Sequence, residues 1–184
     1  MEDVKAFLEQ SFKAGDIVRI YRSNIEDGFF DGFVAGIGDE FFALEIFDDA
    51  CRLDGFSCVR YDDVTEFKLT PYADFNRHFM RLNSIKKNVL PSIDLSSLKS
   101  LLITAGCQFP IITIHIDYED ESVCYIGKVE SVTDTNIDIL YVTPDAEWED
   151  IETYALDEIN RVDFGGAYER ALLMVANDRM NNSS

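Results

Sequence analysis

The chain has 184 residues, of which 47% are hydrophobic and 28% charged, and its formal net charge at pH 7 is -19. A surface this acidic repels phosphate backbones and anionic lipids, so charge disfavours RNA as a partner and we expect no membrane partner. The first residues lack the pattern of a signal peptide, and the apolar runs are far shorter than the roughly 20 residues of a membrane span, so we expect a cytoplasmic protein.

Each half of the chain begins with the pattern of a short amphipathic helix. In the first half, Asp3 is a suitable N-cap, apolar residues follow at helical spacing, and Gly15 predicts the end of the helix. In the second half, Asp94 and Gly106 take the same two roles. We therefore expect a helix at the start of each half.

A segment rich in β-branched residues follows each predicted helix and indicates a strand. These strands are expected at 16–22 and 111–117. Acidic stretches at 23–28 and 118–122 then predict turns into the next strand.

Glycine and aspartate recur 95 positions apart in the two longer strands that follow. Gly32 corresponds to Gly127, and Asp39 corresponds to Asp134. The apolar alternation around them keeps its phase through this offset, so we interpret the chain as two copies of one unit. Glycine inside a strand is typical of a bend, and the aspartates suit the turn between the strands. We therefore expect each sheet to curl.

The remainder of each copy predicts a variable loop, two short strands and a closing helix. The loops are expected at 48–55 and 143–150, and the strand pairs at 57–69 and 152–164. Each closing helix carries an apolar stripe, which we interpret as core packing. The stripe residues are Tyr72, Phe75, Phe79 and Leu82 in the first copy, and Tyr168, Leu172 and Val175 in the second.

The order of helix, five strands and helix is thus written twice, with residues 1–90 as the first domain and 91–184 as the second. Five short antiparallel strands bent by glycine are typical of a small barrel. We predict a mostly β fold with flanking helices, in which two tandem five-stranded small barrels each carry an N-terminal and a C-terminal helix. A copy of this length buries a modest core of its own.

This pattern resembles the Sm-like fold, and other SH3-like small barrels would have almost the same pattern. The first Sm-like motif is a glycine, alternating apolar residues, an aspartate turn and a second apolar strand, and it is similar to 32–44 and 127–139. The second motif, isoleucine-arginine-glycine with a polar pair and an aliphatic residue, is similar in outline to 59–64. The resemblance implies strand edges that pair between neighbours, in this family into rings, and an RNA site.

The RNA-binding residues of that family carry over only in part. The family uses a polar residue after the aspartate turn together with the arginine-glycine of the second motif. Arg60 is present, but Tyr61 replaces the glycine, and apolar residues follow the first turn. In the second copy Asn136 is polar, whereas Ala155 and Leu156 replace arginine and glycine. Since fold does not imply function, RNA binding is the alternative function here.

We expect a protein that acts through protein contacts or self-assembly, as a homo-oligomer or with a protein partner. Phe29, Phe30 and Trp148 do not fit the alternation of apolar and polar residues in the predicted strands. They are therefore candidate contact residues, unless they pack beneath their own loops. RNA binding would instead need Arg22 to join a local basic spot with Arg52 and Arg60. The candidate binding residues are Phe29, Phe30, Arg60, Tyr61, Asn136 and Trp148.

No catalytic, metal or cofactor site is predicted. The four cysteines form no CxxC pair, and His78 and His115 are far apart in sequence, so we expect free thiols in a reducing compartment rather than zinc ligands. No spacing suggests a catalytic triad or a phosphate-binding glycine loop. The acidic run at 145–152 lacks the glycine and alternating oxygens of a calcium loop. We therefore expect no cofactor and no enzyme activity.

Overall fold

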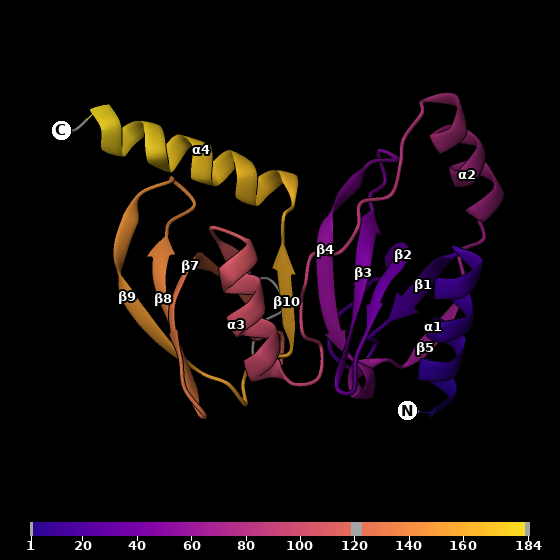
Figure 1. Cartoon of the computed structure of the whole chain (residues 1–184), viewed down its shortest axis with the longest axis horizontal. Helices are drawn as coiled ribbons and strands as arrows, with labels where there is room; N and C mark the ends of the chain where they lie inside the picture. The colour runs from indigo at the N-terminus through magenta and orange to yellow at the C-terminus, as the bar shows by residue number, and fades with distance from the viewer. Residues whose placement is uncertain (1, 119–122, 183–184) are drawn as a thin grey trace.

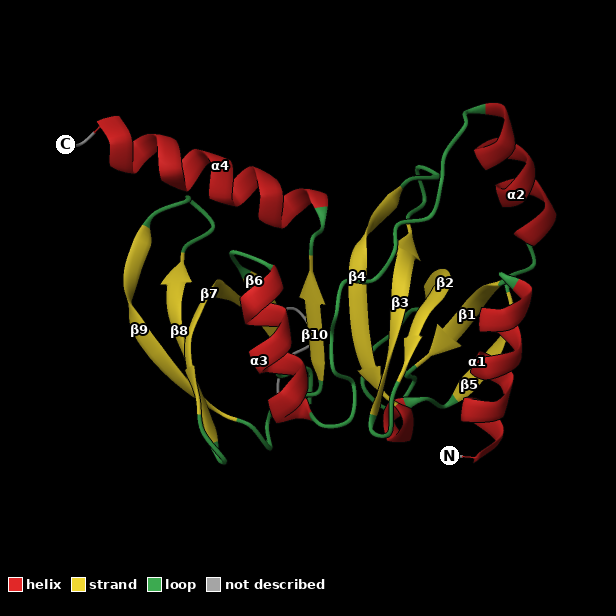
Figure 2. Ribbon diagram, in the orientation of Figure 1, coloured by secondary structure: helices red, strands yellow, loops and turns green. Residues whose placement is uncertain are grey.

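The computed structural model describes residues 2–118 and 123–182 of the chain. The protein is mostly β with flanking helices (Figure 2). The strands are β1 (Ile17–Tyr21), β2 (Phe30–Ile37), β3 (Phe41–Phe47), β4 (Leu53–Arg60), β5 (Glu66–Leu69), β6 (Ile112–His115), β7 (Cys124–Val132), β8 (Asn136–Val142), β9 (Trp148–Ala155) and β10 (Arg161–Phe164). The helices are α1 (Glu2–Ala14), α2 (Ala73–Leu82), α3 (Leu98–Gln108), α4 (Ala167–Asn182) and the short 3-10 helix η1 (Tyr61–Asp63).

Two of the sequence predictions concern a turn at 118–122 and membrane-spanning segments. The acidic turn predicted at 118–122 lies outside them, apart from Tyr118. Within residues 2–118 and 123–182, none of the helices combines the length and the apolar character that crossing a bilayer requires.

All ten strands belong to one antiparallel sheet, in the order β5-β1-β2-β3-β4-β10-β6-β7-β8-β9. The first five strands form one half of the sheet and the last five form the other, and β4 joins β10 between them (Figure 1). The sequence predicted two separate barrels. Among the described strands, however, β5 does not pair with β4, nor β10 with β9, so the sheet is open. The reason is that β4 finds its partner in the other half of the chain.

The strand registers of the two halves agree after the 95-residue offset. Gly32 pairs with Ile46 between β2 and β3, and Gly127 pairs with Tyr141 between β7 and β8. Both strand pairs carry a register shift two residues past the glycine. The pairing of β3 with β4 and of β8 with β9 also agrees pair by pair, whereas the first strand of each half departs by one residue. The offset in the sequence therefore recurs in the backbone pairing.

Gly32 and Gly127 lie where two strands approach too closely for a side chain. A Cβ atom on Gly32 would lie 2.6 Å from the carbonyl oxygen of Glu45, and one on Gly127 would lie 2.3 Å from that of Leu140. Such distances between a Cβ atom and backbone are not tolerated, so the close approach itself requires glycine. The register shifts follow these glycines rather than coinciding with them.

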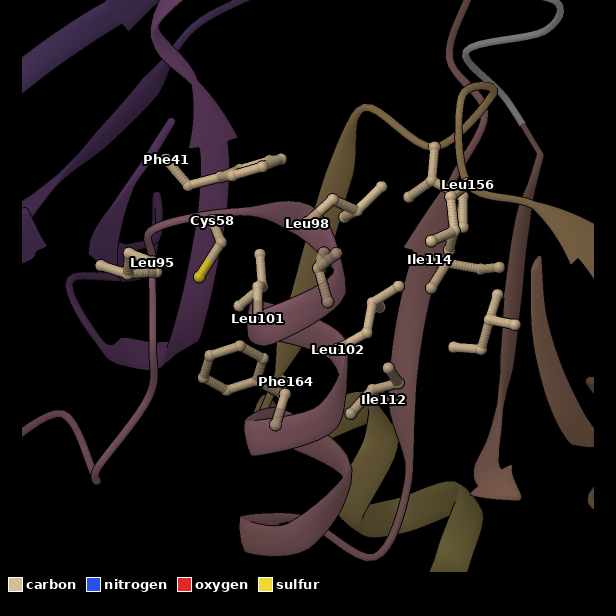
Figure 3. Close-up of a cluster of buried hydrophobic side chains, with 14 of the residues drawn as sticks. Phe41, Cys58, Leu95, Leu98, Leu101, Leu102, Ile112, Ile114, Leu156 and Phe164 are labelled. Carbon is tan, nitrogen blue, oxygen red and sulfur yellow. The ribbon is translucent and has the colours of Figure 1, made fainter. Parts of the chain in front are cut away.

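The largest hydrophobic cluster spans both halves, and α3 lies at its centre (Figure 3). Leu101 and Leu102 of α3 are fully buried. They share this cluster with Phe41 and Cys58 of the first half and with Ile114 of the second. A separate cluster under α1 belongs to the first half alone. The two halves therefore share their largest core, and each half also has a smaller cluster of its own.

The first helix ends just before Gly15, as predicted, whereas both ends of α3 differ from the sequence prediction. Ser97, rather than Asp94, is the N-cap of α3, and its side chain accepts a hydrogen bond from the backbone N–H of Ser100. The carboxylate of Asp94 accepts the N–H of Ser96 in the preceding loop. Gly106 lies inside α3, where the missing side chain lets the helix approach β7 closely.

Most of the apolar stripe predicted for the closing helices is exposed, which corrects the expectation of core packing. In α2, Asn76 and Met80 are the buried residues, and Met80 joins a small cluster at the edge of the sheet. In α4, Leu172 and Ala176 are buried. The exposed residues of the predicted stripes are Tyr72, Phe75, Leu82, Tyr168 and Val175. Each helix touches the sheet along a narrow line, so a wide stripe is not covered.

Candidate functional site

The seam between β4 and β10 is where the two halves of the chain meet. Its register runs from Val59 opposite Arg161 to Phe56 opposite Phe164. The ring centres of Phe56 and Phe164 lie 5.9 Å apart. Charged side chains from both halves gather beside this seam, which makes it the candidate functional site.

A buried ion pair links the halves near the seam. Nη2 of Arg22, in the first half, donates to Oδ2 of Asp117, in the second, over 2.6 Å. Both side chains are 0% exposed. Nε of Arg22 also donates to Oε1 of Glu26 over 2.7 Å. Since a buried charge is costly unless it is paired, this arginine holds the two halves in one relative position.

A second set of charges extends the pair along β6 and β10. Nε2 of His115 lies 2.8 Å from Oδ2 of Asp163, and its Nδ1 lies 2.7 Å from Nη2 of Arg161. Nη1 of Arg161 reaches Glu26 at 3.3 Å and Asp117 at 3.7 Å. Burial alone would raise the pKa of Asp117, but the neighbouring His115 and the nearby arginines lower it. The pKa of Asp163 is lowered as well, so Asp117 and Asp163 stay ionised against the arginines.

Reasoning from sequence did not find this charged cluster. The RNA-binding alternative needed Arg22 in a local basic spot, and the structure disagrees because this side chain is fully buried. Sequence reasoning did not join Asp117 to Arg161. The available signal was charged or titratable residues next to apolar strand residues, as at 111–117 and 161–164.

An acidic cavity of about 450 Å³ lies close to this cluster. Its walls come from the turn between β2 and β3, the end of β4, η1, the residue two before α3 and the segment after β6. Four carboxylates and one guanidinium line it, so the cavity is negatively charged. The lining residues are Asp39, Glu40, Arg60, Tyr61, Asp62, Asp63, Ser96 and Tyr118.

Two of the predicted binding residues, Arg60 and Tyr61, line this cavity. Nε of Arg60 lies 3.7 Å from Oε1 of Glu40, and its guanidinium carbon lies 5.4 Å from the ring centre of Phe41. Tyr61 is 3% exposed, and its hydroxyl donates to the carbonyl oxygen of Gly38 over 3.3 Å. Burial raises the pKa of Tyr61 to about 12. Nε of Arg60 has no hydrogen-bond partner, so Arg60 meets Glu40 only as a loose ion pair, and the tyrosine mainly forms a wall.

Phe29 and Phe30, adjacent in sequence, have different surroundings. Phe30 lies beside the charged cluster, with its ring centre 5.4 Å from the guanidinium carbon of Arg22 and 5.2 Å from that of Arg161. Phe29 is 46% exposed, and the guanidinium of Arg19 stacks 3.6 Å from its ring centre. Phe30 therefore belongs to the junction, and Phe29 stays a candidate contact residue at the surface.

Asn136 and Trp148 lie in the second half and do not line the acidic cavity. Asn136 begins β8, pairs with Ala155 of β9, and accepts a hydrogen bond from the hydroxyl of Thr135 over 2.6 Å. Trp148 is the first residue of β9 rather than part of a loop, and it packs against the cluster that contains Leu172. The predicted arginine–tyrosine pair thus shares a cavity, and the other four predicted residues are dispersed.

Among the described strands, β5 and β9 each leave one backbone edge unpaired, at opposite ends of the sheet. After the offset, β9 is the equivalent of β4, and β5 is the equivalent of β10. Leu69 on β5 is 48% exposed, and Ile151 on β9 is 56% exposed. Lys68 and Glu152, beside them, are exposed as well. These open strands hold the positions of the seam strands in the repeat, but their side chains are more exposed, and β9 carries three acidic residues.

Within the described residues, no three His, Cys, Asp or Glu side chains are grouped so as to hold a metal ion. The four cysteines are free. Comparison of the chain with protein-family models, curated proteins and solved structures found no match. Function must therefore be inferred from the geometry of the chain itself.

Proposed function

We propose that this chain is a non-catalytic self-assembly module, built from two Sm-like or SH3-like small-barrel repeats at about residues 1–90 and 91–184. The observation that carries the proposal is the seam, where β4 pairs with β10 while the equivalent strands β9 and β5 are open. The open edges of β9 and β5 are equivalent to the two edges that pair at the seam, so the same kind of pairing can form between chains. Such a head-to-tail contact closes into a ring or grows into a filament.

The repeated strand order supports the small-barrel interpretation. In each half the fifth strand lies beside the first, and the second, third and fourth follow in sequence. The resemblance to the Sm-like family rests on the same glycine and aspartate motifs in both halves. In that family, strand edges pair between neighbours into rings.

The side chains at the open edges complement each other in the register of the seam. Moving the β4–β10 register by the 95-residue offset onto β9 and β5 places Lys68 of one copy opposite Glu152 of the next. It places Leu69 opposite Ile151, where the seam has two phenylalanines. Charged residues on a strand edge usually prevent indiscriminate pairing. Here their opposite signs select a second copy of the same chain, and each such cross-strand pair contributes roughly 0.2–1 kcal/mol.

The RNA-binding alternative is disfavoured because each of its three arginines already lies near a carboxylate. Arg22, Arg52 and Arg60 each lie within 3.7 Å of a carboxylate. Arg22 is also fully buried. A phosphate would have to displace these carboxylates on a chain whose net charge is -19.

Sedimentation velocity at about 0.15 M salt, where long-range repulsion is screened, tests the proposal. We expect a species of two or more copies. The variant K68E should lower the mass to that of one chain, and K68E/E152K should restore it because the pair is rebuilt with its charges exchanged. K128E, which makes the same charge change on β7, is the matched control and should assemble as the wild type does.

Two results would contradict self-assembly. One is a wild-type mass of a single chain at every concentration tested. The other is a K68E variant that assembles like the wild type. A single chain that also binds oligouridine at low salt, with binding that falls steeply as salt is added, would place the RNA alternative first.

A further inference from the structure

The acidic cavity contains one carboxylate with an unfilled hydrogen-bonding position. Asp63 is 8% exposed. Its Oδ1 accepts the hydroxyl hydrogen of Tyr118, and its Oδ2 has no hydrogen-bond partner. A buried acceptor without a donor loses its hydration and gains nothing in return. Among the described lining residues, this oxygen is the buried acceptor without a hydrogen-bond donor.

The other carboxylates of the cavity are unequally engaged. Asp39 lies 3.5 Å from Nζ of Lys5, and Glu40 lies 3.7 Å from Arg60. Asp62 is exposed, and no ion pair to it is found among the described residues. Burial raises the pKa of Asp63, against the charges of Arg22 and Arg60, which lower it. The cavity thus holds an excess of negative charge that its own side chains do not neutralise.

We propose that this cavity binds the ammonium or guanidinium group of a basic side chain on a peptide. The oxygen of Asp63 without a partner would accept an N–H of the ligand, and Asp62 would lie near its charge at the mouth. The half-exposed ring of Tyr118 offers an aromatic wall to the cation. The cavity volume of about 450 Å³ admits such a side chain.

Competing ligands fit less well. A phosphate or a nucleic acid would meet an excess of carboxylates, because four of them line the cavity against one arginine. A metal ion would need three or more ligands in place, and the described residues hold no such group. The cavity is built from both halves of one chain, so this proposal does not rest on assembly through the strand edges.

Fluorescence anisotropy tests the proposal with the peptide Gly-Ser-Gly-Arg-Gly-Ser-Gly, carrying an electrically neutral dye, at about 0.15 M salt. Peptides with lysine or glutamine in the central place separate guanidinium, ammonium and neutral ligands. We expect saturable binding of the arginine or lysine peptide and none of the glutamine peptide. D63N keeps the shape of the side chain and removes its charge, so it should weaken binding by about tenfold or more.

The control is D145N, which removes one exposed negative charge from the second half. Binding to D145N should be within twofold of the wild type, which separates a site from general attraction to an acidic protein. If D63N does not fold, D62N takes its place, because Asp62 is exposed and its loss should weaken binding about threefold.

Three results would overturn the proposal. The first is equal binding of the basic and glutamine peptides. The second is a folded D63N variant, or D62N in its place, that binds like the wild type. The third is equal weakening by D145N. The edge variant K68E should bind the peptide normally, so a failure of assembly and a failure of this site give different results.

Discussion

The buried pair of Arg22 and Asp117 gives the sharpest prediction for stability. We expect D117N to lower the free energy of unfolding by about 3–5 kcal/mol, the usual cost of removing one partner from a buried ion pair. The hydrogen bond that it weakens is 2.6 Å long, and both side chains are 0% exposed. Arg161 also loses a carboxylate at 3.7 Å. Glu26 and Asp163 would then have to neutralise both arginines.

The same pair predicts how the loss depends on pH. The native pKa of Asp117 is lowered: burial acts to raise it, but the neighbouring His115 and the arginines outweigh burial. A carboxylate whose pKa is lower in the folded than in the unfolded state adds stability above its unfolded value of about 3.9. That contribution disappears as pH falls through the native value. The difference between wild type and D117N should therefore be largest near neutral pH and shrink in acid.

Urea unfolding, followed by circular dichroism at pH 7 and in acid, measures this difference. The double variant R22M/D117L replaces the pair by apolar side chains and should recover most of the lost stability. The matched control is D145N, an exposed change that should stay within about 0.5 kcal/mol of the wild type. A cost of less than about 1 kcal/mol for D117N, or a loss in R22M/D117L equal to the sum of its single variants, would show that the pair does not stabilise the fold in this way.

Three further predictions concern the shared core, the crowded strand pair and the thiols. L101A should cost about 2–5 kcal/mol in urea unfolding because Leu101 is fully buried in α3, whereas I103A on the exposed face of α3 should cost far less; equal losses would contradict the packing. G127A should destabilise the fold, because its Cβ would lie 2.3 Å from a carbonyl oxygen of β8, and an unchanged unfolding midpoint would refute that close approach. In the native protein, Cys107 should react with Ellman's reagent at once and Cys58 only after denaturation, because Cys58 is buried and burial raises the pKa of its thiol; prompt reaction of both would contradict this burial.

Much of the local structure follows from short sequence patterns, such as alternating apolar residues and glycine within a strand. Alternating apolar residues predicted the strands on both sides of Asp39, and β2 and β3 lie there. The recurrence of Gly32 at Gly127 anticipated equal registers in the two halves, because strand pairing depends on which residues face the same side. Helix boundaries were less accurate. Ser97, rather than Asp94, is the N-cap of α3. Several polar residues in that loop are of a type that caps helices, and the sequence does not show which one does.

The candidate site was less predictable than the strands. Arg60 and Tyr61 were identified from a motif and do line the acidic cavity. The sequence did not single out Asp63. The chain has many acidic residues, and the sequence does not show which of them becomes buried. Tyr118 lies 55 residues from Asp63 along the chain and meets it only when the two halves pack.

The amino-acid sequence by itself determined the strands, the mostly β character and the 95-residue offset, because these depend on side-chain alternation and on glycine within short segments. The tertiary structure alone decided that β4 pairs with β10, that α3 fills a core shared by both halves, and that Arg22 is buried against Asp117. Each of these contacts joins residues far apart in the chain. Their free energy depends on burial and on the exclusion of water, and neither exists until the two halves have packed together.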